Sequence, residues 1–315
     1  MSEPTLPDWG VPFLKVKKPS PDWFKNAINH PFDSHFVEVE GCPIHYLKWH
    51  NLTQESTDKP GILFIHGGGA HANWWRFTAP LLADSFEVAA IDLSGMGDSG
   101  NREEYSAAIR AVEIREVLRN CQFNKTKFVV GHSFGGYMSM RFGADYGDEI
   151  DHMVIVDSPI RHPDDPEGQT PRRALSVERY YPSFDIALER FRLMPPQDCD
   201  NKYLVEFIAR HSLRETSRGW TWKFDVEAMG KSRWGEPFHE HIRNLECPSS
   251  LIYGEHSALV SADTAKHMST LMGPSATIIE IKGARHHIML DRPLEFADTV
   301  RHLLTTKQET SVGES

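Results

Sequence analysis

The 315-residue sequence is poor in cysteine: it has four, and none of them forms a CxxC pair. Structural zinc sites and redox-active disulfides bring cysteines together at short, regular spacing. That spacing is absent here, so we expect reduced thiols, no metal centre and a cytoplasmic protein. The residues concerned are Cys42, Cys121, Cys199 and Cys247.

Positive charge is outnumbered, with 34 lysine and arginine residues against 44 aspartate and glutamate residues, and the formal net charge is -10 at pH 7. An acidic surface repels phosphate backbones, which excludes nucleic acid as a partner. The small basic run of Lys15, Lys17 and Lys18 is typical of a solvated arm. We therefore expect the partner to be a small-molecule substrate.

Long apolar runs are missing as well. No stretch approaches the about 18 consecutive apolar residues that a membrane helix needs. Residues 1–10 are polar and contain proline, without the apolar region of a secretory signal. We expect neither membrane insertion nor secretion.

The remaining composition, with 40% hydrophobic and 25% charged residues, is that of an ordinary globular protein. Residues 1–33 are expected to form an N-terminal arm that packs on the body. Residues 34–40 and 44–49 alternate in the manner of strands. Residues 41–43 between them predict a turn, and the three segments together predict an antiparallel hairpin.

Short apolar runs follow the hairpin, and their lack of alternation is typical of parallel strands buried on both faces. They lie at residues 62–65, 88–91, 128–130, 153–156 and 250–253. Helices are predicted at residues 74–83, 106–120, 134–146 and 293–305. With a last strand at 276–281, this rhythm predicts an α/β fold with helices on both faces of a parallel sheet. The polar residues 307–315 predict a flexible tail.

Between residues 159 and 245 the strand rhythm stops. The pattern there is helical, as at residues 176–192 and 203–217, and aromatic side chains are concentrated in it. We expect a helical cap at 159–245, inserted into a core made of residues 34–158 and 246–306.

The GHSFG segment at residues 131–135 lies where a predicted strand meets a predicted helix. A sharp turn of this kind strains the backbone of the central serine, and side chains two residues before and after it would clash, which favours glycine. The turn exposes the Ser133 hydroxyl at a helix N-terminus, where negative charge is stabilised. We predict that Ser133 is a nucleophile. A serine that only caps the helix is the alternative.

A second glycine-rich segment, HGGG at residues 66–69, follows the first buried strand. A tetrahedral intermediate carries negative charge on oxygen, and backbone N–H groups must already point at that place. Glycine lets the backbone approach closely, and the residue after the nucleophile also donates its N–H. We predict that Gly68 and Phe134 form the oxyanion hole, with Gly69 as a substitute for Gly68.

The GARHH segment at residues 283–287 follows the last strand. A histidine in this loop can reach the serine turn, so we predict His286 as the general base and His287 as a packing residue. The loop DLSGMGDS at residues 92–99 is expected to be structural. In it, Asp92 and Asp98 would hold the backbone through side-chain hydrogen bonds.

Together these motifs resemble the α/β-hydrolase superfamily, in the serine-hydrolase branch that carries a helical cap after the sixth core strand. The resemblance covers residues 35–305. It implies a mostly parallel eight-stranded sheet and an acyl-enzyme mechanism, without cofactor or metal. Two positions depart from the family pattern. Arg285 stands where the histidine motif usually has a second glycine, and Ser257 stands where many members carry the triad aspartate.

The histidine needs a carboxylate, because it becomes positively charged during the reaction. Glu255 lies two residues before the usual acid position, but the strand end is expected to point it elsewhere. Asp157 follows four apolar strand residues, at the sheet edge where Ser133 emerges. The resemblance extends to it, because some cap-bearing members take their acid from this strand end. We predict the triad Ser133, His286 and Asp157, with a capping role for Asp157 as the alternative.

The leading functional hypothesis is hydrolysis of a carboxylic ester or thioester. Haloalkane dehalogenases and epoxide hydrolases share the fold but use an aspartate nucleophile, which Ser133 disfavours. A second hypothesis is carbon–carbon bond hydrolysis of a ring-cleavage product. Residues 66–69 and 72–74 are similar to the oxyanion loop of that family, although its usual proline and acid are missing. A third hypothesis is a small-molecule receptor on the same fold.

The aromatic residues of the predicted cap indicate an enclosed apolar pocket for small or medium acyl groups. Aromatic residues that simply pack in a core are the alternative. The predicted pocket residues are Trp74, Trp220, Trp222 and Leu259. The pattern carries no prediction of oligomeric state.

Overall fold

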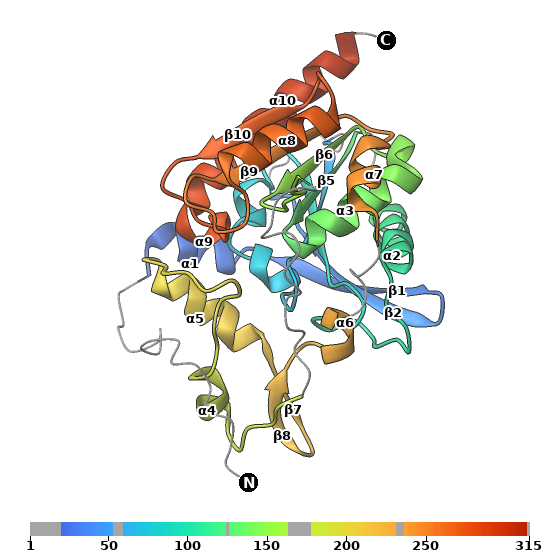
Figure 1. The fold of residues 1–315 in the computed structure, drawn as a ribbon. Coiled ribbons are helices and arrows are strands. Elements are labelled where there is room, and N and C mark those ends of the chain that lie inside the picture. The colour runs from blue at the N-terminus through green and yellow to red at the C-terminus, as the bar shows by residue number, and fades with distance from the viewer. Residues whose placement is uncertain (1–19, 53–58, 124–125, 163–177, 231–235, 314–315) are drawn as a thin grey trace.

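A computed structural model describes residues 20–52, 59–123, 126–162, 178–230 and 236–313 of the chain. Its centre is one eight-stranded sheet in the order β1-β2-β4-β3-β5-β6-β9-β10 (Figure 1). The strands are β1 (Phe32–Val39), β2 (Cys42–Trp49), β3 (Gly61–Ile65), β4 (Glu87–Ile91), β5 (Lys127–His132), β6 (His152–Val156), β9 (Ser249–Gly254) and β10 (Thr277–Ile281). β2 pairs antiparallel with β1 and β4, and the other pairings in this sheet are parallel. The predicted mostly parallel α/β sheet is confirmed.

The β1–β2 hairpin closes one residue earlier than the sequence suggests. Glu40 and Gly41 form its turn, with φ of 47° and 76°. Positive φ at two consecutive residues is typical of the turn whose twist matches that of the flanking strands. Cys42 and Pro43 were expected in the turn, but they lie in β2, where Pro43 pairs with Glu38.

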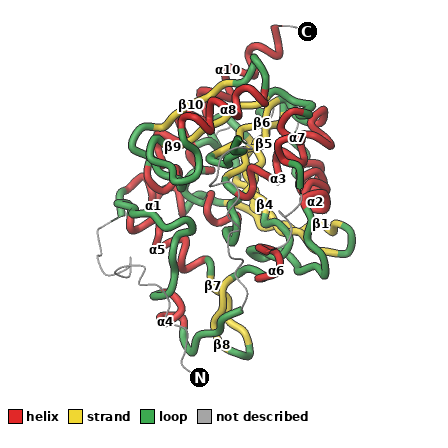
Figure 2. The backbone as a smooth tube through the Cα atoms, viewed as in Figure 1, coloured by secondary structure: helices red, strands yellow, loops and turns green. Residues whose placement is uncertain are grey.

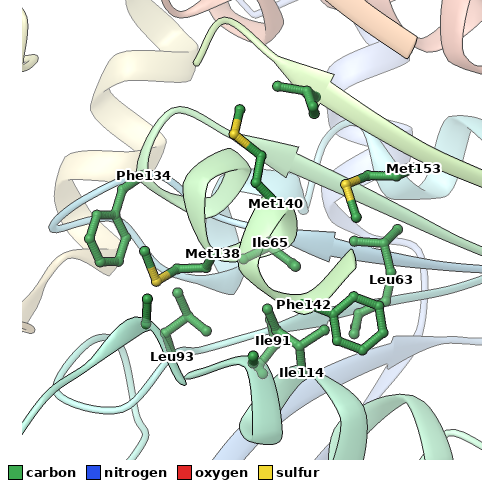
Figure 3. Packing of buried hydrophobic residues seen from close by; sticks show 14 of the residues in the cluster. Leu63, Ile65, Ile91, Leu93, Ile114, Phe134, Met138, Met140, Phe142 and Met153 are labelled. Carbon is green, nitrogen blue, oxygen red and sulfur yellow. The ribbon is translucent and has the colours of Figure 1, made fainter. Parts of the chain in front are cut away.

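Helices cover both faces of the sheet, as predicted. One face packs on α2 (Ala107–Asn120), α3 (Phe134–Tyr146), α7 (Phe238–Arg243) and α8 (Ala262–Met272). The other packs on α1 (Asp22–Ile28), α5 (Lys202–His211), α9 (Ile288–Asp291) and α10 (Pro293–Gly313). Strand residues alternate between the two layers: Leu63 and Ile65 of β3 face the first, as Figure 3 shows, and Ile62 and Phe64 face the second. Both faces are apolar, which explains why the strand sequences do not alternate.

Two predicted helices have different limits. The segment 74–83 forms two short 3-10 helices, η2 (Ala72–Trp75) and η3 (Ala79–Leu81), because Pro80 has no N–H with which to continue an α-helix. A third, η4 (Gly147–Glu149), follows α3. At the other end of the chain, α10 continues past the predicted end at residue 305 to Gly313. A helix thus occupies residues for which a flexible tail was expected.

The region predicted as a helical cap contains strands as well as helices (Figure 2). Its elements include α4 (Phe184–Leu188), α5, β7 (Leu213–Thr216), β8 (Gly219–Trp222) and α6 (Val226–Gly230). The helix predicted at 176–192 is reduced to α4 within the described residues, and the one predicted at 203–217 ends at His211. The antiparallel β7–β8 hairpin follows it, since Trp220, Thr221 and Trp222 favour strands.

The predicted cap does not form one separate layer. Its last helix, α7, contacts α3 and α8 of the core, and the rings of Phe238 and Tyr137 lie 4.9 Å apart. By contrast, α4, β7 and β8 lie at the end of the molecule away from α10 (Figure 1), whereas α5 packs in the same helix layer as α10. The assignment of the whole range 159–245 to a cap stays a prediction. None of the described helices is both long and apolar enough to span a membrane.

A backbone ladder joins the cap to the core loop that follows β4. Met96 of that loop forms an antiparallel bridge with Phe224, just after β8. Next to it, the Gly97 N–H donates to the carbonyl of Lys223 at 2.8 Å. The Lys223 ammonium group also lies 2.6 Å from the carboxylate of Asp98. The root of the cap hairpin is therefore fixed to the core by main-chain and ionic contacts.

Candidate active site

Ser133 occupies the sharp turn between β5 and α3. Its φ of 53° and ψ of -115° are a strained combination for a residue with a side chain. A Cβ on Gly131 would lie 2.6 Å from the Gly135 carbonyl oxygen, and one on Gly135 would lie 2.5 Å from that of His66. These close approaches explain the two glycines of the motif.

The side chain of Ser133 is half-buried, whereas its neighbours His132 and Phe134 are buried. It makes no capping hydrogen bond to α3, so the alternative of a capping serine is not supported. The hydroxyl stays available at the N-terminus of a helix, where partial positive charge stabilises an anion.

His286 lies in the loop between β10 and α9, and its Nδ1 is 2.9 Å from Oδ1 of Asp157. Both side chains are buried, at 1% and 0% exposure. Among the described residues, none is a hydrogen-bond partner for Nε2 of His286. Since Asp157 accepts the Nδ1 proton, Nε2 carries a lone pair that can accept another. Nε2 of His132, the residue before Ser133, lies 3.1 Å from the carbonyl oxygen of His286, so the histidine loop adjoins the serine turn.

Asp157 follows β6 with a φ of 48°. Its Oδ2 accepts the Gly254 N–H at 2.9 Å, and its Oδ1 accepts the Ser257 hydroxyl at 2.6 Å as well as His286. These donors lie across the sheet edge, so the side chain does not act as a cap for the residues that follow it. Asp157 is therefore a buried carboxylate that accepts three hydrogen bonds, one of them from the His286 ring.

Glu255, the other candidate acid, points elsewhere. Its carboxylate accepts the Gly283 N–H at 2.8 Å and lies 3.2 Å from Nζ of Lys282. These contacts and an exposed position give Glu255 the role of a brace for the histidine loop. The geometry thus joins His286 to Asp157 and leaves Glu255 outside; we name Ser133, His286 and Asp157 the elbow triad.

The HGGG segment passes beside the serine turn. A Cβ placed on Gly67 would lie 3.5 Å from Cβ of Ser133. The ring of His66 holds this segment: its Nε2 accepts the Leu93 N–H at 3.0 Å, and its Nδ1 donates to the Gly67 carbonyl at 2.7 Å. Burial lowers the pKa of His66, which keeps the ring neutral, as this arrangement requires. The oxyanion role of Gly68 and Phe134 stays a prediction.

Asp92 holds its loop as predicted, by accepting the N–H groups of Ala72 and Asp98. The prediction for Asp98 was wrong, because its carboxylate pairs with the side chain of Lys223 instead. Burial opposes ionisation of Asp92, but the hydrogen bond and charge of the His45 ring outweigh it and lower the pKa of Asp92 to about 2.

A contact that the sequence did not reveal extends from Asp92 to the β1–β2 hairpin. Nδ1 of His45 lies 2.7 Å from Oδ2 of Asp92, and Nε2 of His45 lies 2.8 Å from the hydroxyl of Ser34. His45 and Asp92 are buried, at 3% and 0%, and Ser34 is exposed. We name these residues the hairpin triad. A charged residue directly after a buried strand was the available signal for Asp92, as it was for Asp157.

Two groups of side chains in the described ranges have the composition of a metal site. In one, single ring nitrogens of His132, His286 and His287 lie within 4.8 Å of one another; the other is His45 with Asp92 and Asp98. Burial, and then the neighbouring His286 ring, lower the pKa of both His132 and His287. Neutral imidazoles of this kind can bind transition metals. In the first group, however, the His286 ring is already hydrogen-bonded to Asp157, so a metal there would compete with the elbow triad.

The predicted pocket residues fall into two pairs. Trp74 in η2 lies 5.3 Å from the His287 ring, and Leu259 donates its N–H to Ser257 at 3.0 Å; both therefore lie next to the elbow triad. The described contacts of Trp220 and Trp222 are within the cap, where they pack with Phe184, Tyr181 and Phe191. A role of these two tryptophans in the pocket stays a prediction.

Comparison with known proteins shows the family of the chain. The sequence model described as the alpha/beta hydrolase family matches residues 62–299, a range that includes all three residues of the elbow triad. The chain belongs to the alpha/beta hydrolase family. Within this family it is 30% identical over 293 residues to esterase Rv0045c of Mycobacterium tuberculosis, covering 89% of this chain and 92% of the relative. It is also 24% identical over 308 residues to epoxide hydrolase 1 of Caenorhabditis elegans, covering 90% and 73%.

Solved structures of this family share the fold. The crystal structure of esterase Rv0045c superposes with a TM-score of 0.68 and 24% identity, covering 90% of this chain and 95% of that one. An E-2-(acetamidomethylene)succinate hydrolase superposes with a TM-score of 0.73 and 21% identity, covering 87% and 100%. The expected α/β-hydrolase fold is therefore confirmed, and the chain is a hydrolase of this superfamily.

Proposed function

We propose that this hydrolase cleaves carboxylic esters, thioesters included, with small or medium apolar acyl groups, through an acyl-enzyme on Ser133. The observation that carries the proposal is the buried contact of 2.9 Å between His286 and Asp157, beside the strained serine turn. It supplies an oriented base next to an accessible hydroxyl, which is the arrangement that nucleophilic catalysis needs.

The proposed reaction has two stages. Oγ of Ser133 attacks the carbonyl carbon while Nε2 of His286 takes its proton; the bond to the leaving alcohol or thiol then breaks as His286 returns that proton. In the second stage His286 takes a proton from water, the hydroxide attacks the acyl carbon, and the acid is released as Ser133 recovers its proton. Asp157 stabilises the positive His286 ring in both stages.

The negative oxygen of each tetrahedral intermediate would accept the N–H groups of Gly68 and Phe134. Phe134 is the first residue of α3, so its N–H belongs to the unpaired first turn of a helix. The His66 contacts keep the glycine-rich segment beside Ser133 before substrate arrives. Pre-organised donors of this kind are worth about 3–4 kcal/mol each in acyl transfer.

The relatives support a hydrolase. The choice between their reactions favours the ester class, because residue 133 is a serine. Esterase Rv0045c matches the chain over most of both lengths. Similarity to an epoxide hydrolase concerns the fold, because an alkyl-enzyme ester requires a carboxylate nucleophile and position 133 is serine. The cytoplasmic location expected from the sequence remains part of the proposal, and the four cysteines are free thiols, as a reducing compartment would have them.

Fluorophosphonate labelling with peptide mass spectrometry tests the nucleophile. We expect one adduct, on Ser133, and faster turnover of p-nitrophenyl acetate and butyrate than of long-chain esters. Ser34→Ala is the matched control and should label normally. An adduct elsewhere, or no adduct in a protein that is folded, contradicts the mechanism. Faster cleavage of a dienone acid from a ring-cleavage pathway than of any ester would instead favour carbon–carbon hydrolysis.

A further inference from the structure

Ser257 stands where many relatives carry the triad acid, and it touches the carboxylate that has replaced that acid. Its hydroxyl oxygen lies 2.6 Å from Oδ1 of Asp157, the oxygen that also binds His286. Ser257 is half-buried and belongs to the loop after β9. The departure from the family pattern is therefore in direct contact with the elbow triad.

The direction of this hydrogen bond is fixed by the loop itself. The N–H groups of Leu259 and Val260 donate to the Ser257 oxygen at 3.0 and 3.1 Å. A hydroxyl has two acceptor lone pairs and one proton, so both lone pairs are used and the proton is directed to Asp157. Ser257 is thus an oriented donor, held by the same loop that carries Leu259 of the predicted pocket.

The strand ends that carry Asp157 and Ser257 lie side by side. β6 and β9 are parallel neighbours, with Val156 paired to Ile252. The Asp157 N–H continues this pairing by donating to the Ile252 carbonyl at 2.9 Å. The Gly254 N–H of β9 in turn donates to Oδ2 of Asp157 at 2.9 Å. Residues 157 and 257 therefore approach the same point from two adjacent strands.

We propose that Ser257 is a positioning residue for the triad acid Asp157. This inference rests on the proposed function. The Ser257 hydroxyl, held by the N–H groups of Leu259 and Val260, fixes the Asp157 oxygen that holds the His286 ring.

The positioning role predicts a loss of turnover without a loss of substrate binding. In Ser257→Ala the Asp157 carboxylate keeps His286 and Gly254 but loses the donor that fixes Oδ1. We expect kcat to fall about tenfold, since hydrogen bonds to charged groups are worth a factor of this order, while KM changes little. Ser257→Thr keeps the hydroxyl and should restore kcat.

Ser250→Ala is the matched control for these variants. It removes another hydroxyl of β9, one that is fully buried and lies 2.8 Å from Nε2 of His152, away from the elbow triad. It should lower stability without changing kcat. If Ser257→Ala retains full kcat, or if Ser257→Thr is as slow as Ser257→Ala, the positioning role is wrong.

The outcomes separate this inference from the proposed function. Circular dichroism and thermal melting establish that each variant is folded. If folded Ser257→Ala retains full kcat while Ser133→Ala is inactive, the positioning role is wrong and the proposed function stands. If Ser133→Ala retains activity, the proposed function itself is wrong, whatever the Ser257 variants give.

Discussion

The elbow triad and the hairpin triad contain the same three residue types, and in each the histidine is hydrogen-bonded to a buried aspartate. The histidine–aspartate contacts are 2.9 Å in the elbow triad and 2.7 Å in the hairpin triad, and both pairs are buried. In the hairpin triad the serine hydroxyl even touches the histidine, at 2.8 Å. In the elbow triad, Nε2 of His286 has no partner among the described residues. Judged by side-chain contacts alone, the hairpin triad is the better assembled.

The backbone around the two serines differs. Ser133 has a positive φ and precedes a helix, with the glycine-rich segment beside it. Ser34 lies in the extended edge strand β1, opposite Leu47, and is exposed. An oxyanion needs N–H groups that converge on it, and a flat strand directs its N–H groups sideways. The comparison teaches that the two triads differ in the surroundings of the serine more than in the three side chains, and that these surroundings are what the proposed function assigns to catalysis.

The largest expected effect is on the nucleophile. Ser133→Ala should lower kcat for p-nitrophenyl acetate by about 10⁶, as triad knockouts do, because the substitution removes, with this hydroxyl, the atom that attacks the ester in the proposed mechanism. Steady-state kinetics on the purified variant check this. Ser34→Ala is the control and should keep normal kcat. Comparable losses in the two variants would break the distinction between the triads.

The second effect concerns the two acids. Asp157→Asn should lower kcat by up to about 10⁴, because the His286 ring loses the charge that orients and stabilises it. Glu255→Gln should be much milder, since Glu255 only braces the histidine loop. Asp92→Asn should leave kcat of the folded enzyme near normal. A greater loss of turnover in Glu255→Gln than in Asp157→Asn would overturn the acid assignment.

The third effect is on stability and belongs to the hairpin triad. The lowered pKa of Asp92, about 2 against an ordinary value of 3.8, corresponds to about 2 kcal/mol. A carboxyl group whose pKa is lowered by folding stabilises the folded state at pH values above its ordinary pKa. This contribution is lost as the pH falls from about 4 towards 2. Urea unfolding of Asp92→Asn should therefore show a deficit of about 2 kcal/mol at pH 6.

That deficit should shrink as the pH is lowered through this window. Asp98→Asn is the control, because its partly exposed ion pair with Lys223 contributes less than about 1 kcal/mol. A pH-independent deficit in Asp92→Asn would mean that the charge of Asp92 is not the source of its contribution.

The smallest effect is expected from the exposed end of the hairpin triad. Ser34→Ala removes one hydrogen bond to His45 and should lower the free energy of unfolding by about 1 kcal/mol or less. Denaturant titration measures it. In Ser133→Ala, fluorophosphonate should leave Ser34 unmodified. An adduct on Ser34 there would show that the hairpin triad reacts without an oxyanion hole.

Most of the core was predictable because its pattern is local. Strands buried on both faces give apolar runs, and the GHSFG segment at 131–135 specifies its own turn. The helix expected at 74–83 failed because Pro80 outweighs the helical periodicity around it. The β7–β8 hairpin was missed because a short aromatic run is compatible with either helix or strand.

The site was predictable where it depends on position in the fold, and not where it depends on packing. Asp157 and His286 follow from the strand ends on which they stand. The roles of Ser257 and Ser34 depend on where a hydroxyl proton points, and Ser34 meets a histidine from the neighbouring strand. No periodicity in the sequence records such contacts, since they arise only when two strands are placed side by side.

The ladder between the cap hairpin and the loop after β4 bears on how the molecule unfolds. Besides the Met96–Phe224 bridge, the Asp225 N–H donates to the Gly95 carbonyl at 2.7 Å. If residues 223–225 unfold, these main-chain hydrogen bonds break, and the loop after β4 that Asp92 organises loses its partners. We therefore expect the predicted cap and the core to unfold together, in a single transition with heat or denaturant. A shortened protein without residues 159–245 would leave Gly95, Met96 and Gly97 of the loop after β4 without these main-chain partners.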